Sequence, residues 1–289
     1  MKKLGKKDIK SILKEYGIKG YLAHEFINAT NSYIYHIKNK NGEFILKSQK
    51  DGQNSLHEIE YEKKVTDYLY SKGISCQRVM ETKDKKLVLK IKGIDYHLLT
   101  YIKGKVLHDK YNKKVYMSVA KNIALMQKEL LKLNIKGNGY GHLNVEKFIK
   151  DGISNYYSDK DIKDYNCLVK TLESIDYSKL RKCVIHSDLS EINIMQYENK
   201  FSGFIDFAYP YKYYMIMDLA YYIANCIIQP AWIKEFFMEY NKIIRLNAEE
   251  KKALYYFILV NLMRKDHLLR DSYPIFRKLK LKDFIKLLK

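Results

Sequence analysis

The chain has 289 residues, of which 47% are apolar and 30% charged, and this globular composition excludes an intrinsically disordered protein. Its 3 Pro and 13 Gly exclude collagen-like and proline-rich architectures. The formal net charge is +20, yet only 6 of the 53 basic residues are Arg. Because base readout and paired phosphate contacts favour the planar guanidinium, we expect a solvated lysine surface and no specific nucleic-acid partner. Weak attraction to polyanions is the alternative.

No apolar run approaches the roughly 20 residues that a membrane span needs, and the basic N-terminus lacks the apolar core of a signal peptide. The four cysteines form no C-x-x-C pair, so we expect reduced and mostly buried thiols. The sequence therefore predicts a cytoplasmic protein that does not act at a membrane.

The N-terminal third mixes helix and strand signals. Four apolar residues with helical spacing begin at Ile9, and Gly17 follows them, which predicts a short amphipathic helix. A longer helix is predicted at 55–71, with Leu56 on its buried stripe and Gly73 as its end. An Asn-Gly dipeptide between two predicted strands indicates a hairpin. The predicted strands are 20–27, 32–38, 43–48, 76–81, 86–91 and 96–102.

Beyond Gly104 the pattern is mostly helical, apart from short strands around a polar loop at 183–208. We therefore predict an α+β fold with an N-terminal sheet domain, 1–103, and a larger helical domain, 104–289. The join at 101–104 would be a hinge, and a cleft between two such domains is a natural ligand site. The predicted helices are 111–133, 144–150, 160–173, 214–228, 231–244, 248–270 and 275–288.

The most informative stretch is the polar loop HSDLSEINIM at 186–195, followed by GFIDF at 203–207. Asp188 and Asn193 lie on the loop, and Asp206 follows a predicted hairpin. Mg²⁺ takes oxygen ligands, usually one or two carboxylates together with substrate phosphates. One carboxylate and one carboxamide, with a second carboxylate nearby, therefore suit metal binding combined with alignment of a hydroxyl group.

Metal binding and alignment of a hydroxyl are two requirements of phosphoryl transfer. This reaction also uses a strand lysine for the α- and β-phosphates, which a glutamate on a neighbouring helix positions. Lys47 ends a predicted strand, and Glu62 lies on the helix that follows. Glu58 lies one turn earlier on the same helix face and is the rival partner for the lysine.

Together these motifs resemble those of the aminoglycoside phosphotransferase and choline kinase superfamily, whose members are relatives of the protein kinases. H-x-D-L-x-x-x-N and I-D-F are similar to its catalytic and metal loops. The order of the motifs matches along nearly the whole chain, and this ordered set is specific whereas any single motif is weak. The other matching segments are NATNSYIYHI for the nucleotide-binding hairpin, EFILK for the strand lysine, EYEKKVTDYL for the helix glutamate, YHLLTYIKG for the hinge strand and MDLA for a helix start.

The resemblance implies a bilobal protein-kinase-like fold and a kinase that moves the γ-phosphoryl group of ATP or GTP to a hydroxyl with the help of Mg²⁺. Asp188 would be the catalytic base, and Asn193 and Asp206 would bind Mg²⁺. Lys47, paired with Glu62, would contact the phosphates. The N-terminal domain would then bind the nucleotide, and the C-terminal domain would carry the catalytic loop and bind the acceptor.

The resemblance also implies further nucleotide contacts and one structural residue. The hinge backbone at Thr100, Tyr101 and Ile102 would meet the adenine, and the hydroxyls of Thr30 and Ser32 would add phosphate contacts. Asp218 would brace the catalytic loop by hydrogen bonds. The chain departs from the family pattern at two places, Ser187 in place of a Gly after the loop His, and a phosphate hairpin without its usual glycines.

The acceptor is expected to be a choline-, homoserine-, sugar- or aminoglycoside-like molecule. A net charge of +20 disfavours polycations at long range, which lowers the aminoglycoside option. Tyrosines at 209–222 with Trp232 could form an aromatic pocket for a cation, but helical core is the simpler interpretation. The alternative function is a catalytically weak kinase-fold binding protein or a spore-coat-associated protein, because the phosphate hairpin lacks its usual glycines. The segment ETKDKKLVLKIKGIDYHLLTYIKG also resembles the spore-coat-associated branch of the superfamily, and the homoserine kinase-like branch is similar too.

Overall fold

The computed structural model forms two compact units. The first contains Met1–Lys103 and Phe204–Ala208, and the second contains Gly104–Gly203 and Tyr209–Lys289. The predicted α+β class is confirmed, because the first unit holds an antiparallel sheet and the second is mainly helical. The described residues are 3–29, 32–49, 56–107, 112–136, 144–151, 159–225, 230–264 and 280–288.

Five antiparallel strands form the sheet of the first unit in the order β1-β2-β3-β5-β4. The predicted hairpin joins β2 and β3, but its turn is Lys40–Asn41, and Gly42 already pairs with Asn39. The Asn41 N–H donates to the side-chain oxygen of Asn39 at 2.6 Å, which closes the turn. The strands are β1 (Tyr21–Asn28), β2 (Ser32–Asn39), β3 (Gly42–Gln49), β4 (Leu89–Ile91) and β5 (Ile94–Thr100).

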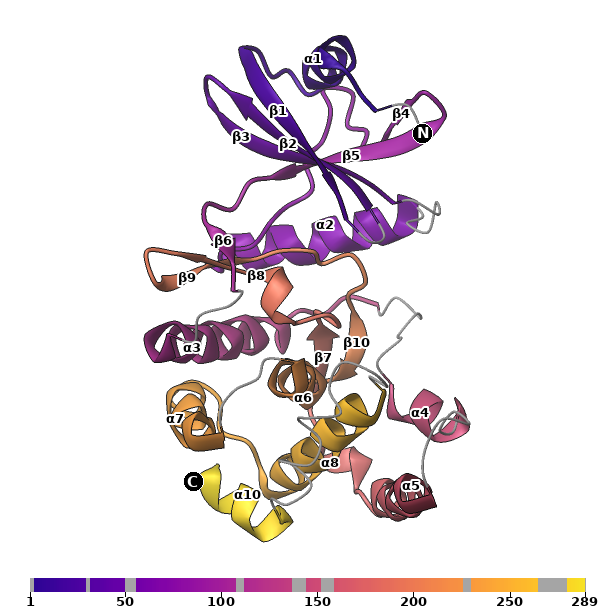
Figure 1. Ribbon diagram of the computed structural model, residues 1–289, viewed down its shortest axis with the longest axis vertical. Helices are drawn as coiled ribbons and strands as arrows, with labels where there is room; N and C mark the ends of the chain where they lie inside the picture. Colours follow the sequence, from indigo (N-terminus) through magenta and orange to yellow (C-terminus); the bar gives the residue numbers. More distant parts are fainter. Residues whose placement is uncertain are drawn as a thin grey trace. The chain divides into compact units, whose positions relative to one another are not determined.

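One helix covers each face of this sheet, as Figure 1 shows. α1 (Lys6–Glu15) packs its buried residues against a cluster that includes Leu98, whereas α2 (Leu56–Ser71) packs against one that includes Leu99. Neighbouring strand residues point to opposite faces, which explains the two separate clusters. Gly73, with φ +77°, ends α2 as predicted, but Leu56 is 54% exposed and was wrongly expected on the buried stripe.

Two of the predicted strands of the first unit are shorter than expected. The segment 76–81 forms only isolated bridges, from Cys76 to Phe204 and from Val79 to Leu99, because its residues pair with two different segments. At 86–91 only β4 pairs, since a turn closed by the Thr82 N–H and the Lys86 carbonyl occupies the residues before it.

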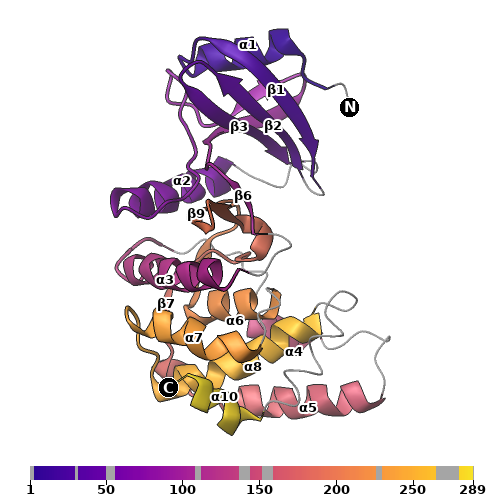
Figure 2. The same ribbon diagram turned by 60° about the vertical axis from the view of Figure 1, so that its left-hand side comes forward.

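The second unit contains two small sheets and most of the helices. In Figure 2, α6, α7 and α8 lie close together below α3; α3 packs against α7, and α8 packs against α6, α5, α4 and α10. The helix predicted from residue 214 begins later because β10 pairs with β7 first. Its elements are β6 (Lys105–Val106), α3 (Lys113–Leu130), α4 (Val145–Asp151), α5 (Asp159–Glu173), η1 (Tyr177–Lys179), β7 (Lys182–Ile185), η2 (Glu191–Asn193), β8 (Ile194–Tyr197), β9 (Lys200–Phe204), β10 (Tyr211–Tyr214), α6 (Ile216–Asn225), α7 (Pro230–Asn241), α8 (Ala248–Arg264) and α10 (Leu281–Leu287).

Gly104, at the start of the second unit, occupies a position that only glycine fits. Its φ is +127°, and a Cβ atom there would lie 2.1 Å from the carbonyl oxygen of Gln196. β6 begins at the next residue and pairs with β8, so this close approach fixes the chain against the small three-stranded sheet.

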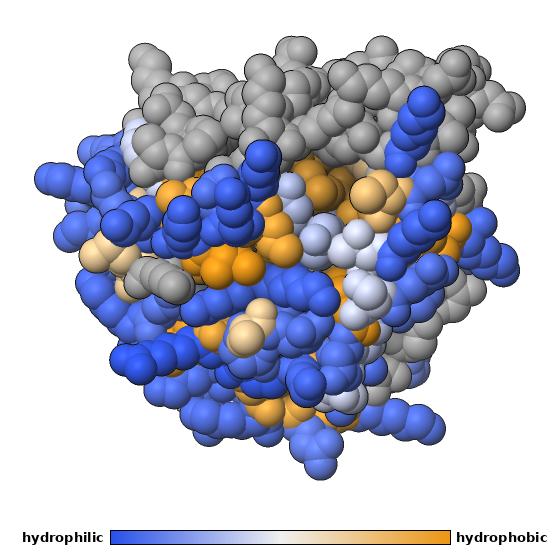
Figure 3. Space-filling view, turned by 90° about the horizontal axis from the view of Figure 1, so that it is seen from below, coloured by the Kyte–Doolittle hydropathy of each residue, from blue (hydrophilic) through white to orange (hydrophobic). Residues whose placement is uncertain are grey.

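The surface seen in Figure 3 is dominated by hydrophilic side chains, with apolar groups scattered between them. Among the described residues, none of the helices combines the length and the hydropathy that crossing a membrane requires. Among the described residues, Cys76 and Cys183 are buried and Cys167 is exposed, whereas Cys226 lies outside them.

Candidate active site

Lys47 and Asp206 form an ion pair in the first unit. Lys47 lies on β3 and is 6% exposed, and its Nζ is 2.7 Å from Oδ1 of Asp206. Asp206 reaches this unit because β9 ends beside the segment after α2, where the Phe204 N–H donates to the Ser75 carbonyl at 3.0 Å. Asp206 has φ +63°, an unusual conformation for a residue other than glycine, which often marks a functional site.

Glu62 on α2 lies in the electrostatic reach of this pair. Its side chain is 3% exposed, and burial raises its pKa to about 7, against the opposing effect of the Lys47 ammonium. Asp206 adds a smaller repulsion that also raises the pKa. Of the two glutamates considered as partners for Lys47, Glu62 is the buried one, whereas Glu58 is only partly buried.

His97 is a fourth ionisable residue of this group, and the sequence reasoning missed it. It lies on β5 directly opposite Lys47, and it is 3% exposed. Burial, together with the neighbouring ammonium of Lys47, lowers its pKa to about 3, so the imidazole is neutral at pH 7. Directly paired residues share a sheet face, but finding His97 needed the β3–β5 register, which no local pattern provides. We call Lys47, Glu62, His97 and Asp206 the lysine cluster.

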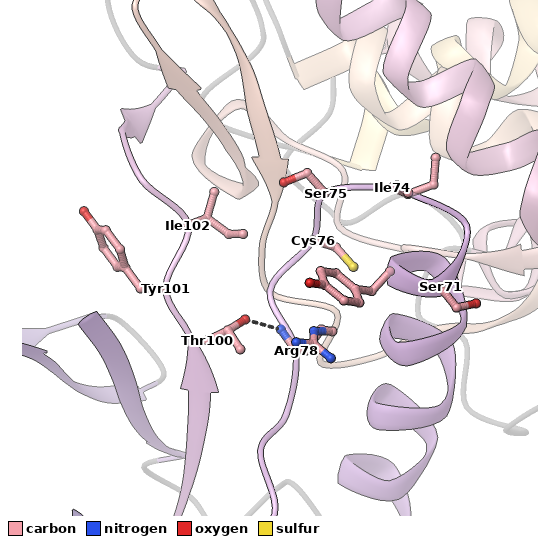
Figure 4. Close-up of a pocket in the computed structure, with 10 residues that line it drawn as sticks. Ser71, Ile74, Ser75, Cys76, Arg78, Thr100, Tyr101 and Ile102 are labelled. Carbon is pink, nitrogen blue, oxygen red and sulfur yellow. Dashed lines mark hydrogen bonds between the residues drawn. The ribbon is translucent and has the colours of Figure 1, made fainter. Parts of the chain in front are cut away.

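The residues predicted to form the hinge, Thr100, Tyr101 and Ile102, are among those that line a pocket of about 670 Å³. Thr100 is held by the segment after α2, since its N–H donates to the Arg78 carbonyl and its own carbonyl accepts from Gln77 Nε2 at 3.1 Å. Figure 4 shows the Thr100 hydroxyl accepting from the Arg78 N–H, and Tyr101 pointing away from the pocket. The Tyr101 ring instead stacks on His36 at 4.7 Å.

The backbone hydrogen bonds of Thr100 bear on the prediction that this segment meets adenine. Both backbone groups of Thr100 are engaged in hydrogen bonds within the protein, so Thr100 holds this segment and does not offer its own N–H or carbonyl to a base. In the phosphate hairpin, Ser32 is 6% exposed, and Thr30 lies outside the described residues.

Asp188 and Asn193 contact each other in the second unit, on the loop between β7 and β8. Asn193 Nδ2 donates to the Asp188 carbonyl and to its carboxylate Oδ2, both at 2.8 Å. Asn193 is 4% exposed and is the last residue of a single 3₁₀ turn, η2. Because the amide nitrogen binds Asp188, the amide oxygen is the atom with which Asn193 would ligate a metal ion. We call residues 186–193 the base loop.

Asp218 braces the base loop, as predicted. It is completely buried in the first turn of α6, and it accepts hydrogen bonds from the N–H groups of His186 at 2.8 Å and Ser187 at 3.0 Å. Burial raises the pKa of Asp218, while these two bonds oppose that shift. Ser187 has φ +71°, the left-handed region that favours glycine, and its hydroxyl donates to the Tyr209 carbonyl at 2.7 Å.

Tyr221 also reaches the base loop, and the sequence interpretation of the tyrosines as helical core was incomplete for it. The side chain is 8% exposed, as expected for core, but its hydroxyl donates to Asp188 Oδ1 at 2.7 Å. The available signal was its position three residues after Asp218, which places both side chains on one face of α6.

The two residues that were predicted to bind Mg²⁺ carry ligand atoms that suit this ion. Asp206 offers a carboxylate and Asn193 an amide oxygen, both hard ligands. The described part of the chain holds no group of three or more His, Cys, Asp or Glu side chains arranged to hold a metal. A Mg²⁺ ion bound by either residue would therefore complete its shell with phosphate oxygens and water.

Comparison with known proteins shows what class of protein this is. A profile of the phosphotransferase enzyme family matches residues 25–251, and the chain therefore belongs to this family. It is a phosphotransferase with a protein-kinase-like fold. A search of curated proteins finds no match.

Similar solved structures cover almost the whole chain at low sequence identity. An amicoumacin kinase in complex with AMP-PNP, Ca²⁺ and Ami is 16% identical, with a TM-score of 0.70 over 98% of this chain and 93% of that one. A microcompartment-associated aminopropanol kinase is 14% identical, with a TM-score of 0.67 over 97% and 92%. A spectinomycin phosphotransferase in complex with ADP and spectinomycin is 15% identical, with a TM-score of 0.64 over 99% and 98%.

Proposed function

We propose that this protein is a Mg²⁺-dependent kinase that transfers the γ-phosphoryl group of ATP or GTP to a hydroxyl group of a small molecule. The observation that carries this proposal is the contact between Lys47 and Asp206, two residues that phosphoryl transfer requires and that are distant in the sequence. Membership of the phosphotransferase enzyme family supports the reaction type.

In this proposal the lysine cluster binds the phosphates of the nucleotide. The Lys47 ammonium contacts phosphate oxygens, and Glu62 orients it from α2. Asp206 would hold Mg²⁺ through its carboxylate, and Tyr101 and Ile102 contact the base, with Thr100 holding the hinge in place. Ser32 and Thr30 add hydroxyl donors from the phosphate hairpin. Bound Mg²⁺ would neutralise charge on the phosphate oxygens.

The base loop binds and aligns the acceptor hydroxyl in this proposal. Asp188 accepts a hydrogen bond from that hydroxyl and takes its proton as the oxygen attacks the γ-phosphorus. The bond from the γ-phosphorus to the bridging oxygen breaks, and the nucleoside diphosphate leaves. Asn193 holds the Asp188 carboxylate through its amide nitrogen and supplies its amide oxygen to the metal. Asp218 keeps the loop backbone in place, which confines Asp188 to the geometry that the transfer needs.

For the acceptor we propose a small molecule of modest positive charge, such as an amino alcohol. The similar structures include an aminopropanol kinase as well as an amicoumacin kinase and a spectinomycin phosphotransferase. A protein with a formal net charge of +20 attracts polycations poorly at long range, which favours a small amino alcohol over an aminoglycoside. Choline, homoserine and sugar-like alcohols are the other acceptors that the experiment below compares.

The test is transfer of a radiolabelled γ-phosphoryl group from ATP or GTP, with Mg²⁺, to choline, homoserine, 1-amino-2-propanol, a sugar and spectinomycin. We expect transfer to at least one alcohol, and a loss of at least about 100-fold in Asp188→Asn because the general base is removed. Asp84→Asn, in an exposed turn, is the matched control and should keep full activity. Equal transfer by the wild-type and Asp188→Asn proteins would contradict the proposal.

The second candidate function is a kinase-fold binding protein with little catalysis. It is favoured by the phosphate hairpin, whose sequence around Asn28 and Ala29 contains no glycine. Binding of Mg²⁺ and ATP, without transfer to any alcohol or to small molecules of a cell extract, would support this function over a kinase.

A further inference from the structure

The carboxylate of Asp188 is held from two different elements. Asn193 Nδ2, on η2, donates to Oδ2 at 2.8 Å, and the Tyr221 hydroxyl, on α6, donates to Oδ1 at 2.7 Å. A carboxylate has about four lone-pair sites, so each oxygen can still accept one further hydrogen bond. Rotation of the carboxylate would break one or both contacts, and its plane is therefore fixed while it can still accept a hydroxyl proton.

Tyr221 can define this orientation because its own position is fixed. It is 8% exposed, and the surrounding turns of α6, from Ile216 to Ala224, are buried throughout. A tyrosine has only two side-chain torsions before its hydroxyl, so a buried ring places the oxygen with little conformational freedom. The phenol therefore acts as a rigid donor rather than as an adaptable surface contact.

One face of α6 supports both the backbone and the side chain of the base loop. Asp218 accepts from the N–H groups of His186 and Ser187, and Tyr221, one turn later, donates to the side chain of Asp188. The backbone of the loop and the carboxylate of Asp188 are thus both held by hydrogen bonds to the same helix, α6. A displacement of the loop would strain both sets of bonds together.

We propose that Tyr221 is a positioning residue for phosphoryl transfer, whose phenol holds the Asp188 carboxylate in the orientation that accepts the proton of the attacking hydroxyl. This inference rests on the proposed function of Asp188 as the general base. Tyr221 acts only through Asp188 and is not itself a proton donor or acceptor in the reaction.

The test compares Tyr221→Phe with the wild type and with Tyr222→Phe. Phe removes only the hydroxyl, and Tyr222 is the next residue of the same helix, with its ring stacked on Phe236. Activity is transfer from Mg–ATP to the best alcohol of the panel above, or to water if no alcohol reacts. Tyr221→His, which keeps a ring and a donor, is the second variant in case Tyr221→Phe does not fold.

We expect Tyr221→Phe to lower kcat by about tenfold and to change the KM for ATP by less than about twofold, because only the alignment of the base is lost. Tyr222→Phe should keep the wild-type kcat, and Tyr221→His should lie between Tyr221→Phe and the wild type. In an Asp188→Asn background, Tyr221→Phe should cause no further loss, since the group that it positions is no longer a base.

Three results would overturn the inference, and they can be told apart. Wild-type activity in Tyr221→Phe beside an inactive Asp188→Asn would remove the role of Tyr221 and leave the kinase proposal standing. A full additional loss in the Asp188→Asn background would show that Tyr221 acts on the fold in general. Equal rates for the wild type and Asp188→Asn would remove the kinase proposal and this inference together.

Discussion

The Lys47 ammonium lies 2.7 Å from the Asp206 carboxylate, although 159 residues separate them in the sequence. The lysine side chain is 7% exposed and the aspartate 38%, so the cation is buried beside an anion that solvent and ligands can reach. A buried ammonium is costly unless it is paired, and Asp206 provides that partner. In the proposed kinase, these two groups would exchange this contact for phosphate oxygens and a metal ion.

Glu62 makes stability depend on pH. Its folded-state pKa is about 7 and its ordinary value 4.5, so between these values the folded protein retains a proton that the unfolded chain loses. The free energy of unfolding contributed by Glu62 therefore falls as the pH rises from 4.5 to 7, by about 3 kcal/mol at about 1.4 kcal/mol per pKa unit.

Urea unfolding of wild-type and Glu62→Gln proteins at several pH values measures this contribution. As the pH rises from 4.5 to 7, the free energy of unfolding of the wild type should fall relative to that of Glu62→Gln. Glu58→Gln, on the same helix, is the matched control for loss of a carboxylate. A difference that does not vary with pH would show that Glu62 is not buried as the structure has it.

His97 has the opposite linkage. Its folded-state pKa of about 3 lies below the ordinary value of 6.5, so the unfolded chain takes up a proton first as the pH falls. Stability should be lost between pH 6.5 and 3 in the wild type but less so in His97→Gln. The comparison uses unfolding curves across this range, with the exposed His57→Gln as control. Identical pH slopes in wild type and His97→Gln would contradict a buried neutral imidazole.

How far the sequence predicts the fold depends on how local each signal is. The hairpin of β2 and β3, the end of α2 at Gly73 and the periodic helix α3 follow from neighbouring residues, and all were predicted. The pairing of β10 with β7 and the bridge from Cys76 to Phe204 join segments far apart in the chain. No local period encodes such pairings, and the strand lengths there were wrong.

The same distinction applies to the candidate site. Asp188, Asn193 and Asp206 stand in a recognisable order, so motif spacing was enough to single them out. His97 and Tyr221 carry no motif, and they matter only because of the β3–β5 register and the packing of α6 against the base loop. Their roles required the three-dimensional structure.

Ser187 combines a strained backbone with a compensating hydrogen bond. A residue other than glycine in the left-handed region costs roughly 1–2 kcal/mol, and the Ser187 hydroxyl bond to the Tyr209 carbonyl offsets about 1 kcal/mol of that. Ser187→Ala keeps the strain and loses the bond, so we expect about 1 kcal/mol of destabilisation. Ser187→Gly loses both and should be near neutral. Urea unfolding checks the order, and an alanine variant more stable than the glycine variant would contradict it.

Asp218 should control the dynamics of the base loop. In Asp218→Asn, one hydrogen-bond acceptor becomes an NH₂ group facing the N–H donors of the loop, which should cost roughly 2–3 kcal/mol. Amide hydrogen exchange should accelerate at His186 and Ser187, because their N–H groups donate hydrogen bonds to Asp218 in the wild type. The control is Asp176→Asn. Asp176 accepts a hydrogen bond from the Ser178 N–H at an exposed 3₁₀ turn, so its substitution should change amide exchange only near that turn. Unchanged exchange at the base loop would show that Asp218 does not brace it.

The most direct measurement for the central claim is calorimetric titration of ATP into the wild-type protein, with Mg²⁺ and after its removal by EDTA. We expect binding that requires Mg²⁺ and that weakens by at least about tenfold in Lys47→Met, because a buried phosphate-binding cation is lost. Lys63→Met, which removes a lysine paired with Asp67 on α2, should bind as the wild type does. Absence of binding, or equal binding by Lys47→Met and the wild type, would contradict the assignment of this protein as a nucleotide-dependent kinase.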